Sequence, residues 1–301
     1  MKVEIDLNIP FDPKEVSLLN MHSVLNVLNV VQFELLNVAD ALGDPPPILD
    51  LINKVASVGL ELGHPDRAIA HVRSIDGLLN AVRTTYDDLA LAHQGKSSHA
   101  ILTSRSNLEG IFAVIVVRAQ EIIQRTENPN VWFTFKAAQL QHNFEQVLHA
   151  IERNSHGAYR IVHNIAEHQE GDYLVYLNFK GNAKGEIVMP PVFQDVMRDL
   201  VANARKYTPP GGRIEAGLVQ SKKELHFAVK DSGIGIPEAE LEKVVYFGNR
   251  GSNVLDRPTH GGGFGLSKAY YVTKMYGGRM WIESPIDQDG GSCIEIRIPL
   301  A

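Results

Sequence analysis

Three short stretches decide how this sequence is interpreted: Asp199-Leu200-Val201-Ala202-Asn203-Ala204-Arg205-Lys206-Tyr207, then Asp231-Ser232-Gly233-Ile234-Gly235-Ile236-Pro237, and then Gly261-Gly262-Gly263-Phe264-Gly265-Leu266. The first stretch is predicted to be helical, and the other two are glycine-rich loops. Each one alone is weak evidence for a nucleotide site. Because all three occur in this order within about 70 residues, together they predict ATP binding.

The predicted helix places two polar side chains on one face. Asn203 and Lys206 are one helical turn apart, so both can point toward the same ligand. The amide oxygen of Asn203 suits Mg²⁺ beside phosphate oxygens, and the Lys206 ammonium is a point charge suited to phosphate. Tyr207 is placed to pack against the ribose or the base. Taken alone, this stretch is equally a surface helix with a chance Asn–Lys pair.

The two loops flank predicted regular elements. Asp231 ends a strand predicted over Leu225–Lys230, where its carboxylate can accept a hydrogen bond from an adenine amino group. Gly233 and Gly235 let the backbone turn tightly beside it, although Asp-Ser-Gly is also ordinary turn chemistry. The second loop opens a helix predicted over 266–276, whose free backbone N–H groups suit phosphate. The immediate helix start argues against a flexible glycine linker.

Together these stretches resemble the GHKL ATPase superfamily and, among its branches, the sensor histidine kinases most closely. Residues 203–212 are similar to the N box of those kinases and the turn that follows it. Residues 231–237 resemble their G1 box, and residues 261–266 resemble their G2 box. Phe247 and Arg250 resemble a shortened F box in a lid between the two loops. The resemblance extends over roughly residues 186–300.

The resemblance implies the fold and the site. It implies an α/β-sandwich GHKL (Bergerat) ATP-binding domain in which Asn203 holds Mg²⁺, Lys206 reaches phosphate and Asp231 reads adenine. The other residues that it assigns to the nucleotide are Asp199, Tyr207, Gly233, Gly235, Ile236, Arg250, Gly261, Gly263, Phe264, Gly265 and Leu266. At position 199 the superfamily often has Asn or Glu, so the role of Asp199 as a base is left open.

The chain is predicted to be α+β with two domains. Residues 14–42 carry a heptad-like apolar seam, and further helical stretches are expected over 48–62, 68–89, 99–126 and 134–168. Strands are expected over 173–179, 213–219, 224–230, 279–284 and 293–298, with a short strand in residues 1–9. We therefore expect an all-α helical bundle over residues 1–170, for dimerisation and phosphoacceptance, and the ATP-binding catalytic domain over residues 171–301.

Composition narrows the protein class. A formal net charge of −6 over 301 residues argues against broad nucleic-acid binding. The single Cys293 excludes an intrachain disulfide and fits a reducing cytosol. The longest apolar run, Ile111–Val117, is too short to span a bilayer, and no signal peptide opens the chain. We expect a cytoplasmic protein without a membrane segment, or a fragment of a longer sensor.

A histidine kinase needs a phosphoacceptor on a bundle helix, and His22 is the best candidate. It lies one position past the seam residue Met21, and we expect it on the exposed flank of the helix. Asn26 follows one turn later, so its amide can hydrogen-bond one ring nitrogen and leave the other with a lone pair. His-x-x-x-Asn resembles the phosphoacceptor box of several kinase subfamilies. Ser23 stands where those boxes often have an acid, and a solvated surface histidine is the alternative.

These features favour an ATP-dependent protein histidine kinase. It would bind Mg-ATP, phosphorylate His22 and pass the phosphate to an aspartate of a response-regulator receiver domain, as a homodimer through the N-terminal helices. Two alternatives stay open. One is a Ser/Thr protein kinase of the mitochondrial dehydrogenase kinase type, which also has a large helical domain before its GHKL domain. The other is a non-catalytic ATP-binding phosphotransfer scaffold.

Overall fold

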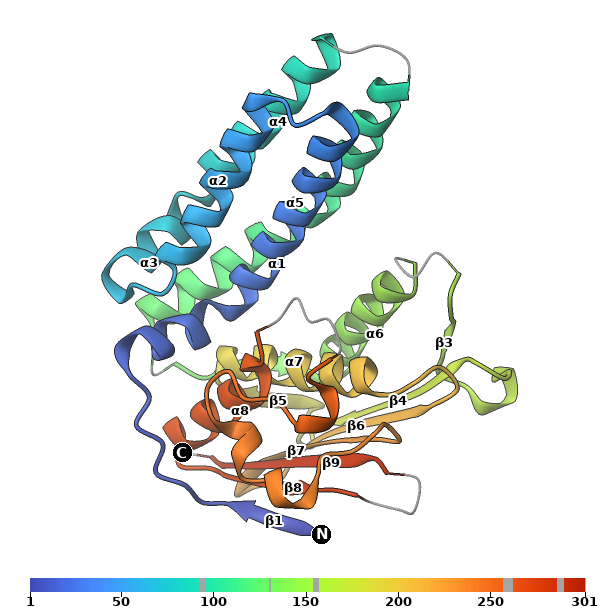
Figure 1. Cartoon of the computed structure of the whole chain (residues 1–301). Coiled ribbons are helices and arrows are strands. Elements are labelled where there is room, and N and C mark those ends of the chain that lie inside the picture. The colour runs from blue at the N-terminus through green and yellow to red at the C-terminus, as the bar shows by residue number, and fades with distance from the viewer. Residues whose placement is uncertain (93–95, 130, 154–156, 257–261, 286–289, 301) are drawn as a thin grey trace. The chain divides into compact units, whose positions relative to one another are not determined.

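The computed structural model describes residues 1–92, 96–129, 131–153, 157–256, 262–285 and 290–300 (Figure 1). The chain forms two compact units, one over Pro10–Pro129 and one over Met1–Ile9 and Asn130–Ala301. We call them the helical unit and the sheet unit. The division therefore lies at Pro129 and not at the predicted residue 170. The reason is that helix α6 (Ala137–Arg153) packs on strand β4 (Tyr173–Lys180) of the sheet unit.

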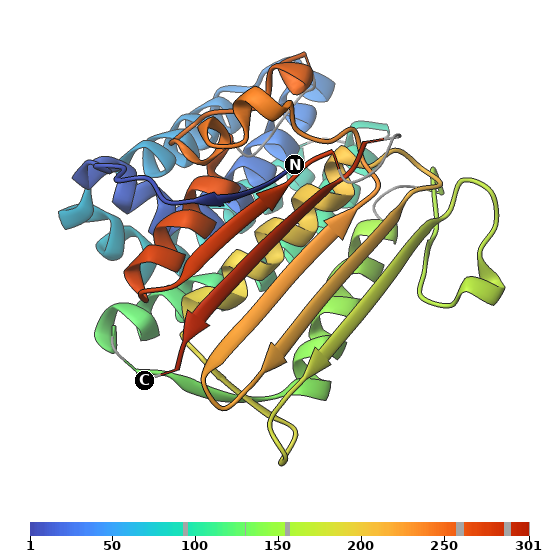
Figure 2. The same ribbon diagram turned by 90° about the horizontal axis from the view of Figure 1, so that it is seen from below.

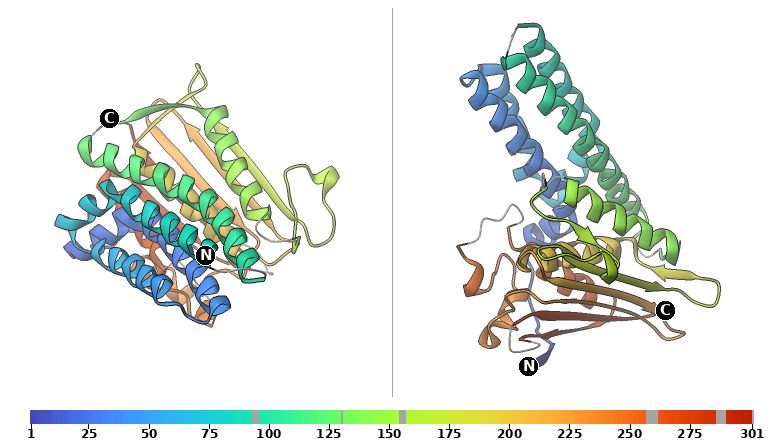
Figure 3. Two further views of the ribbon diagram at one scale, coloured as in Figure 1. Left: turned by 90° about the horizontal axis from the view of Figure 1, so that it is seen from above. Right: turned by 90° about the vertical axis from the view of Figure 1, so that its right-hand side faces the viewer.

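The helical unit consists of helices packed around one apolar core. They are α1 Pro13–Leu42, α2 Pro46–Glu61, α3 Pro65–Arg73, α4 Ile75–Ala92 and α5 Lys96–Glu127 (Figure 3). The Asp12 side chain caps the start of α1 in a capping box with Glu15, and Gly43 ends it in a left-handed conformation with φ 74°. The core includes Leu28, Leu35 and Tyr86. The predicted all-helical character of this part is confirmed.

Helix α1 also has an unusual composition. Among the described residues it is the helix that is long and apolar enough to cross a membrane by length and composition alone. In its most apolar 18-residue window, 39% of the residues are buried inside the structure. Since the core helix of a soluble protein passes the same test, this composition is weak evidence for a membrane span.

The sheet unit is built on a seven-stranded sheet with the order β1-β8-β9-β7-β6-β4-β3. The strands are β1 Lys2–Ile5, β3 Ile161–Val162, β4 Tyr173–Lys180, β6 Arg213–Gln220, β7 Glu224–Asp231, β8 Arg279–Glu283 and β9 Ser292–Pro299. Neighbouring strands are antiparallel from β1 to β6, and β6, β4 and β3 are parallel. A separate antiparallel pair joins β2 Phe133–Lys136 to β5 Glu186–Met189.

Helices cover one face of this sheet. Figure 2 shows the sheet in front of α6, α7 (Pro191–Tyr207) and α8 (Phe264–Met275). Burial alternates along β7, where Phe227 is fully buried while Lys230 is exposed. Such alternation is typical of an antiparallel sheet with one packed face. The α/β sandwich expected from the resemblance is confirmed.

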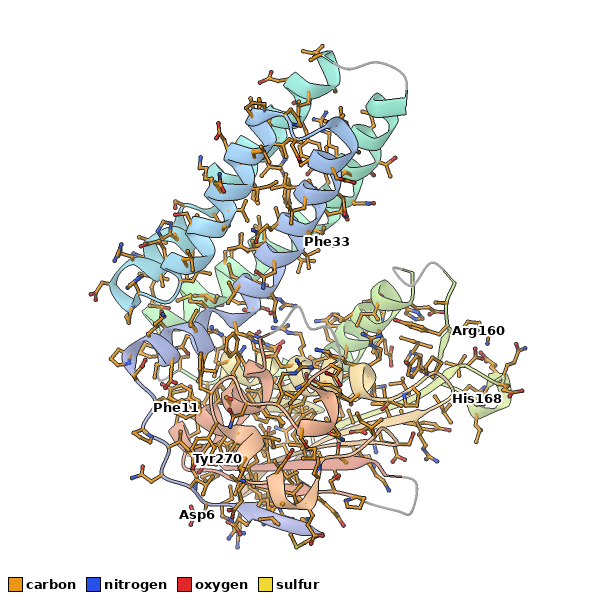
Figure 4. The ribbon with its side chains drawn as sticks, viewed as in Figure 1. Asp6, Phe11, Phe33, Arg160, His168 and Tyr270 are labelled. Carbon is orange, nitrogen blue, oxygen red and sulfur yellow. The ribbon has the colours of Figure 1, made fainter. Side chains whose placement is uncertain are left out.

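The first residues of the chain belong to the sheet unit. Strand β1 pairs antiparallel with β8 at the edge of the sheet. Beyond β1, the backbone of Leu7 bonds the Tyr270 hydroxyl, its N–H donating at 2.8 Å and its carbonyl accepting at 2.5 Å. Asp6 forms an ion pair with Lys274 at 2.7 Å. Figure 4 labels Asp6 and Tyr270, which tie this segment to α8.

One predicted segment is wrong. Residues 134–168 were expected to be helical, but the structure has β2, helix α6, strand β3 and a 3₁₀ turn at Ile165–Glu167. Pairing of β2 with β5 and of β3 with β4 is long-range, and a pattern confined to one segment does not contain it. The strands predicted from residue 173 onward are confirmed within two residues at each end.

Candidate functional site

The three sequence stretches meet around the C-terminal half of α7. Pro191 at the first position starts this helix, and Thr208, held extended with ψ 128° before Pro209, ends it. Helix α8 packs against α7. A Cβ atom built on Gly265 would lie 2.7 Å from Nδ2 of Asn203, so the α8 backbone passes directly over this amide. Only glycine at position 265 lets the two approach this closely.

Asp231 is held at the end of β7 by donors from Gly233 and Ser292. Its Oδ1 accepts the Gly233 N–H at 2.8 Å, and its Oδ2 accepts the Ser292 hydroxyl at 2.5 Å. The residue is 7% exposed, and burial is the main cause that raises the pKa of its carboxyl above the usual value. Since each carboxylate oxygen has two acceptor positions, acceptor capacity remains for a ligand N–H. The geometry fits the predicted contact to an adenine amino group.

The first glycine loop is locked onto its surroundings. A Cβ on Gly233 would lie 2.5 Å from the Tyr207 carbonyl oxygen, which also accepts the Ile234 N–H at 3.2 Å. Gly235 has φ 70°, a conformation that favours glycine. The Ile236 N–H donates to the Ser284 hydroxyl at 2.8 Å. These contacts bring the loop to the end of α7, as the resemblance implied.

Positive side chains gather near the end of α7. Burial lowers the pKa of the Lys206 ammonium, and the charges of Arg250 and Arg205 lower it further. The Lys206 ammonium also lies 5.3 Å from the centre of the Tyr207 ring. Like charges held together in this way are stabilised when an anion binds between them. The cluster is therefore suited to the phosphates of a nucleotide.

The second glycine loop leads into α8. Gly263 precedes the helix with φ 80°, and a Cβ there would lie 3.1 Å from the Gly248 carbonyl oxygen. Phe264, the first residue of α8, stacks on Phe247 with ring centres 4.6 Å apart. Leu266 is half-buried in the first turn. Gly261, also predicted for the site, lies outside the described residues.

The donors for a metal ion are sparse. Within the described ranges, no group of three or more His, Cys, Asp or Glu side chains is placed to hold a metal ion. Mg²⁺ often keeps several waters and binds through one or two protein ligands plus substrate phosphates. The half-buried Asn203 amide beside the positive cluster fits that donor set.

Asp199 has a partner that sequence reasoning missed. Its Oδ2 lies 3.3 Å from the Lys268 ammonium on α8, and Asp195 Oδ2 lies 3.4 Å from the same nitrogen. Lys268 is 1% exposed. The sequence contains one signal of this contact: Lys268 stands within a mostly apolar helix, and the preceding helix carries two aspartates one turn apart. Ser292 and Ser284 were also missed, and only the pairing of β7 with β9 places Ser292 beside Asp231.

His22 is not on an exposed flank, contrary to the prediction. Its side chain is 4% exposed, between Leu19 at 0% and Val24 at 0% on α1. Side chains from outside the helix cover this part of α1, which the periodicity of one helix does not reveal. The expected contact to Asn26 is present, with Asn26 Nδ2 3.1 Å from His22 Nε2. Since this amide nitrogen only donates, Nε2 accepts and its lone pair is engaged.

Comparison with known proteins agrees with this geometry. Residues 190–301 match the family of histidine kinase-, DNA gyrase B- and HSP90-like ATPases. Sensor histidine kinase Hik2 of Thermosynechococcus vestitus is 36% identical over 108 residues, which cover 36% of this chain and 28% of that protein. Adaptive-response sensory kinase SasA of Synechococcus elongatus is 34% identical over 112 residues, which cover 37% of this chain and 28% of that protein.

Among solved structures, the mycobacterial sensor histidine kinase MprB aligns with 56% of this chain and 97% of that chain, with a TM-score of 0.41 and 19% identity. The aligned parts of Hik2 and SasA are 28% of each protein, so the likeness concerns one domain and not the remainder of either. Residues 190–301 of this chain form a GHKL-superfamily ATPase domain whose relatives are sensor histidine kinases.

Proposed function

We propose that this protein is an ATP-dependent protein histidine kinase that binds Mg-ATP in its sheet unit. The main support is the convergence of Asp231, Asn203 and the Lys206 cluster around α7, within a domain of this family. Asp231 accepts the adenine amino group, and Lys206 and Arg250 contact the phosphates. The first backbone N–H groups of α8 add donors for phosphate oxygens.

In this proposal Asn203 supplies a neutral oxygen to Mg²⁺, and Asp199 orients a water or the metal's hydration shell. When bound, Mg²⁺ neutralises charge on the phosphate oxygens. The residues of the chain position the nucleotide and stabilise its charge, which are the main contributions a protein makes to phosphoryl transfer. The remaining site glycines shape the backbone around the ligand.

The phosphate is proposed to pass to His22, and then to an aspartate of a response-regulator receiver domain. A neutral ring nitrogen attacks the γ-phosphorus, the bond to the bridging oxygen breaks, and ADP leaves. In the described conformation the His22 ring is buried and its Nε2 accepts a hydrogen bond from Asn26. Transfer therefore requires a conformation in which the ring is exposed and one nitrogen lone pair is released.

The same burial favours one alternative, a non-catalytic ATP-binding scaffold whose helical unit docks a partner. Incubation with γ-labelled ATP and Mg²⁺ separates the two. The kinase should incorporate acid-labile label, and His22→Gln should abolish it while ATP binding persists. His142→Gln, at an exposed position of α6, is the matched control. Full labelling of His22→Gln would eliminate His22, acid-stable label would indicate a Ser/Thr kinase, and no label would favour the scaffold.

We also propose a cytoplasmic homodimer formed through the helical unit. The seam residues Leu28 and Leu35 are buried within one chain and need no second copy. The support comes instead from large apolar side chains that stay exposed on α1 and α5: Val30, Phe33, Leu36, Val114 and Val117 (Figure 4 labels Phe33). Sedimentation equilibrium tests this proposal, and a single 33.3 kDa species at high concentration would contradict it.

A further inference from the structure

A buried cation on α8 lies beside the two aspartates that precede Asn203 on α7. The Lys268 ammonium is within 3.4 Å of Asp195 and 3.3 Å of Asp199, yet it makes no directed hydrogen bond to either carboxylate. Asp195 is 3% exposed and is also paired with Arg198. The ammonium is thus held by charge, in the interior of the sheet unit.

This placement is costly unless the charge has a use. Taking an ammonium out of water carries a large desolvation penalty, which opposite charges nearby only partly offset. The next position, Ala269, is buried and apolar, and Lys268 itself is 1% exposed, so an aliphatic side chain at 268 would be buried without that penalty. Departures of this kind from ordinary core composition concentrate at functional sites.

The geometry indicates what the charge is for. Asp195, Asp199 and Asn203 are spaced at four-residue intervals, so they follow one face of α7. Gly265 and Lys268 are one turn apart on α8, and Gly265 approaches Asn203 while Lys268 approaches Asp199. Helix α8 therefore places a residue without a side chain, Gly265, against Asn203, the proposed metal ligand. One turn later it places the Lys268 ammonium against the Asp199 carboxylate.

We propose that Lys268 is a positioning residue for nucleotide turnover, which fixes the Asp199 carboxylate on α7 one turn from Asn203. The inference rests on the proposed ATP site. Without the ammonium, the carboxylates of Asp195 and Asp199 repel each other at their four-residue spacing. Asp199, the more exposed of the two at 17%, then turns away from α8. Nucleotide affinity does not need this orientation, whereas the reaction does.

The test compares Lys268→Met, which keeps an unbranched side chain but removes its charge, with Lys274→Met, at an exposed position of the same helix. Calorimetric Mg-ATP affinity is expected to stay within about threefold of the unmodified protein, because the Lys268 side chain is 1% exposed and its ammonium faces Asp195 and Asp199. Turnover of Mg-ATP is expected to fall by about 10–100-fold, as for loss of other groups that orient a metal-site residue. Lys274→Met should leave both unchanged.

A double-mutant cycle separates positioning from general structural support. Asp199→Asn and the double variant Lys268→Met with Asp199→Asn should turn over ATP at the same rate. In urea unfolding without nucleotide, Lys268→Met should change the free energy of unfolding less favourably in the unmodified protein than in Asp199→Asn, where Asp195 is the carboxylate left beside position 268. If the Lys268→Met variant does not fold, the comparison of ATP turnover between Asp199→Asn and the double variant still tests whether Lys268 acts through Asp199.

A further loss of turnover in the double variant, or additive effects on stability, would overturn the role of Lys268. So would a loss of Mg-ATP affinity that accounts for the loss of turnover. If the unmodified protein itself does not bind Mg-ATP, the proposed function fails instead, and the stability cycle still reports whether Lys268 and Asp199 are coupled.

Discussion

Replacing Gly265 by Ala should lower the affinity for Mg-ATP without unfolding the protein, so it tests the role of Asn203 in metal binding separately from its role in the fold. The new Cβ would lie 2.7 Å from Asn203 Nδ2, and its next contacts in the structure are at 3.6 and 3.7 Å to other atoms of the same side chain. The three nearest atoms that the methyl group meets therefore all belong to the Asn203 side chain. To reach ordinary contact at 3.4 Å, the amide must retreat by about 0.7 Å.

Such a shift displaces the proposed Mg²⁺ ligand but should not disrupt the fold. Position 265 lies in the first turn of α8, where Gly to Ala adds about 0.4–1 kcal/mol of stability in the absence of a clash. Because the Asn203 amide must move, we expect a gain of at most this amount. That corresponds to about 1–4 °C in Tm for a domain of this size. Loss of the groups that orient a metal ligand costs about 10- to 100-fold in metal affinity, so we expect a loss of Mg-ATP affinity between about 10- and 100-fold.

Calorimetric titration with ATP in Mg²⁺ and in EDTA, with a thermal unfolding scan of each variant, measures both quantities. The loss should appear in Mg²⁺ and be about threefold or less in EDTA. Gly110→Ala is the matched control, since it lies within α5 and its added Cβ would meet nothing within 4 Å. In an Asn203→Ala background, Gly265→Ala should have no further effect on affinity. Unchanged Mg-ATP affinity of Gly265→Ala in a folded protein would refute the assignment of Asn203.

Asp231→Asn should weaken ATP binding by about tenfold or more, because a donor replaces the acceptor for adenine. The same variant should raise Tm at neutral pH, because burial raises the pKa of Asp231 and its charged form opposes folding. That gain should vanish in acid, where Asp231 is protonated, and a variant less stable at neutral pH would contradict this account. Burial and the charges of Arg250 and Arg205 lower the pKa of Lys206 from 10.5. Because phosphate binds the charged ammonium, ATP affinity should fall as the pH rises, beginning below pH 10.5. Lys206→Arg should remove this dependence in calorimetry between about pH 7 and pH 10, and an identical decline in both proteins would exclude Lys206 as the titrating group.

Local patterns predicted the helices and strands that carry the proposed nucleotide site. Glycines at 233, 235, 263 and 265 lie at positions where a positive φ or a close approach of neighbouring atoms admits little else. Asn203, Lys206 and Asp231 lie at the ends of a helix and a strand whose periodicity is evident in the sequence. Helix and strand periodicity and the glycine turns depend on residues close together in the chain, so they can be predicted from the sequence.

Contacts between distant segments were decided only by the tertiary structure. Ser292 reaches Asp231 because β9 pairs with β7, and β1 joins the sheet because it pairs with β8 near the other end of the chain. Lys268 finds Asp199 across a helix–helix contact, and His22 is buried by side chains that its own helix does not supply. The sequence by itself predicted the class of ligand that we propose and the backbone turns around its proposed site. Burial and long-range pairing, which arise from the packing of segments far apart in the chain, determined which charges are paired and which histidine is accessible.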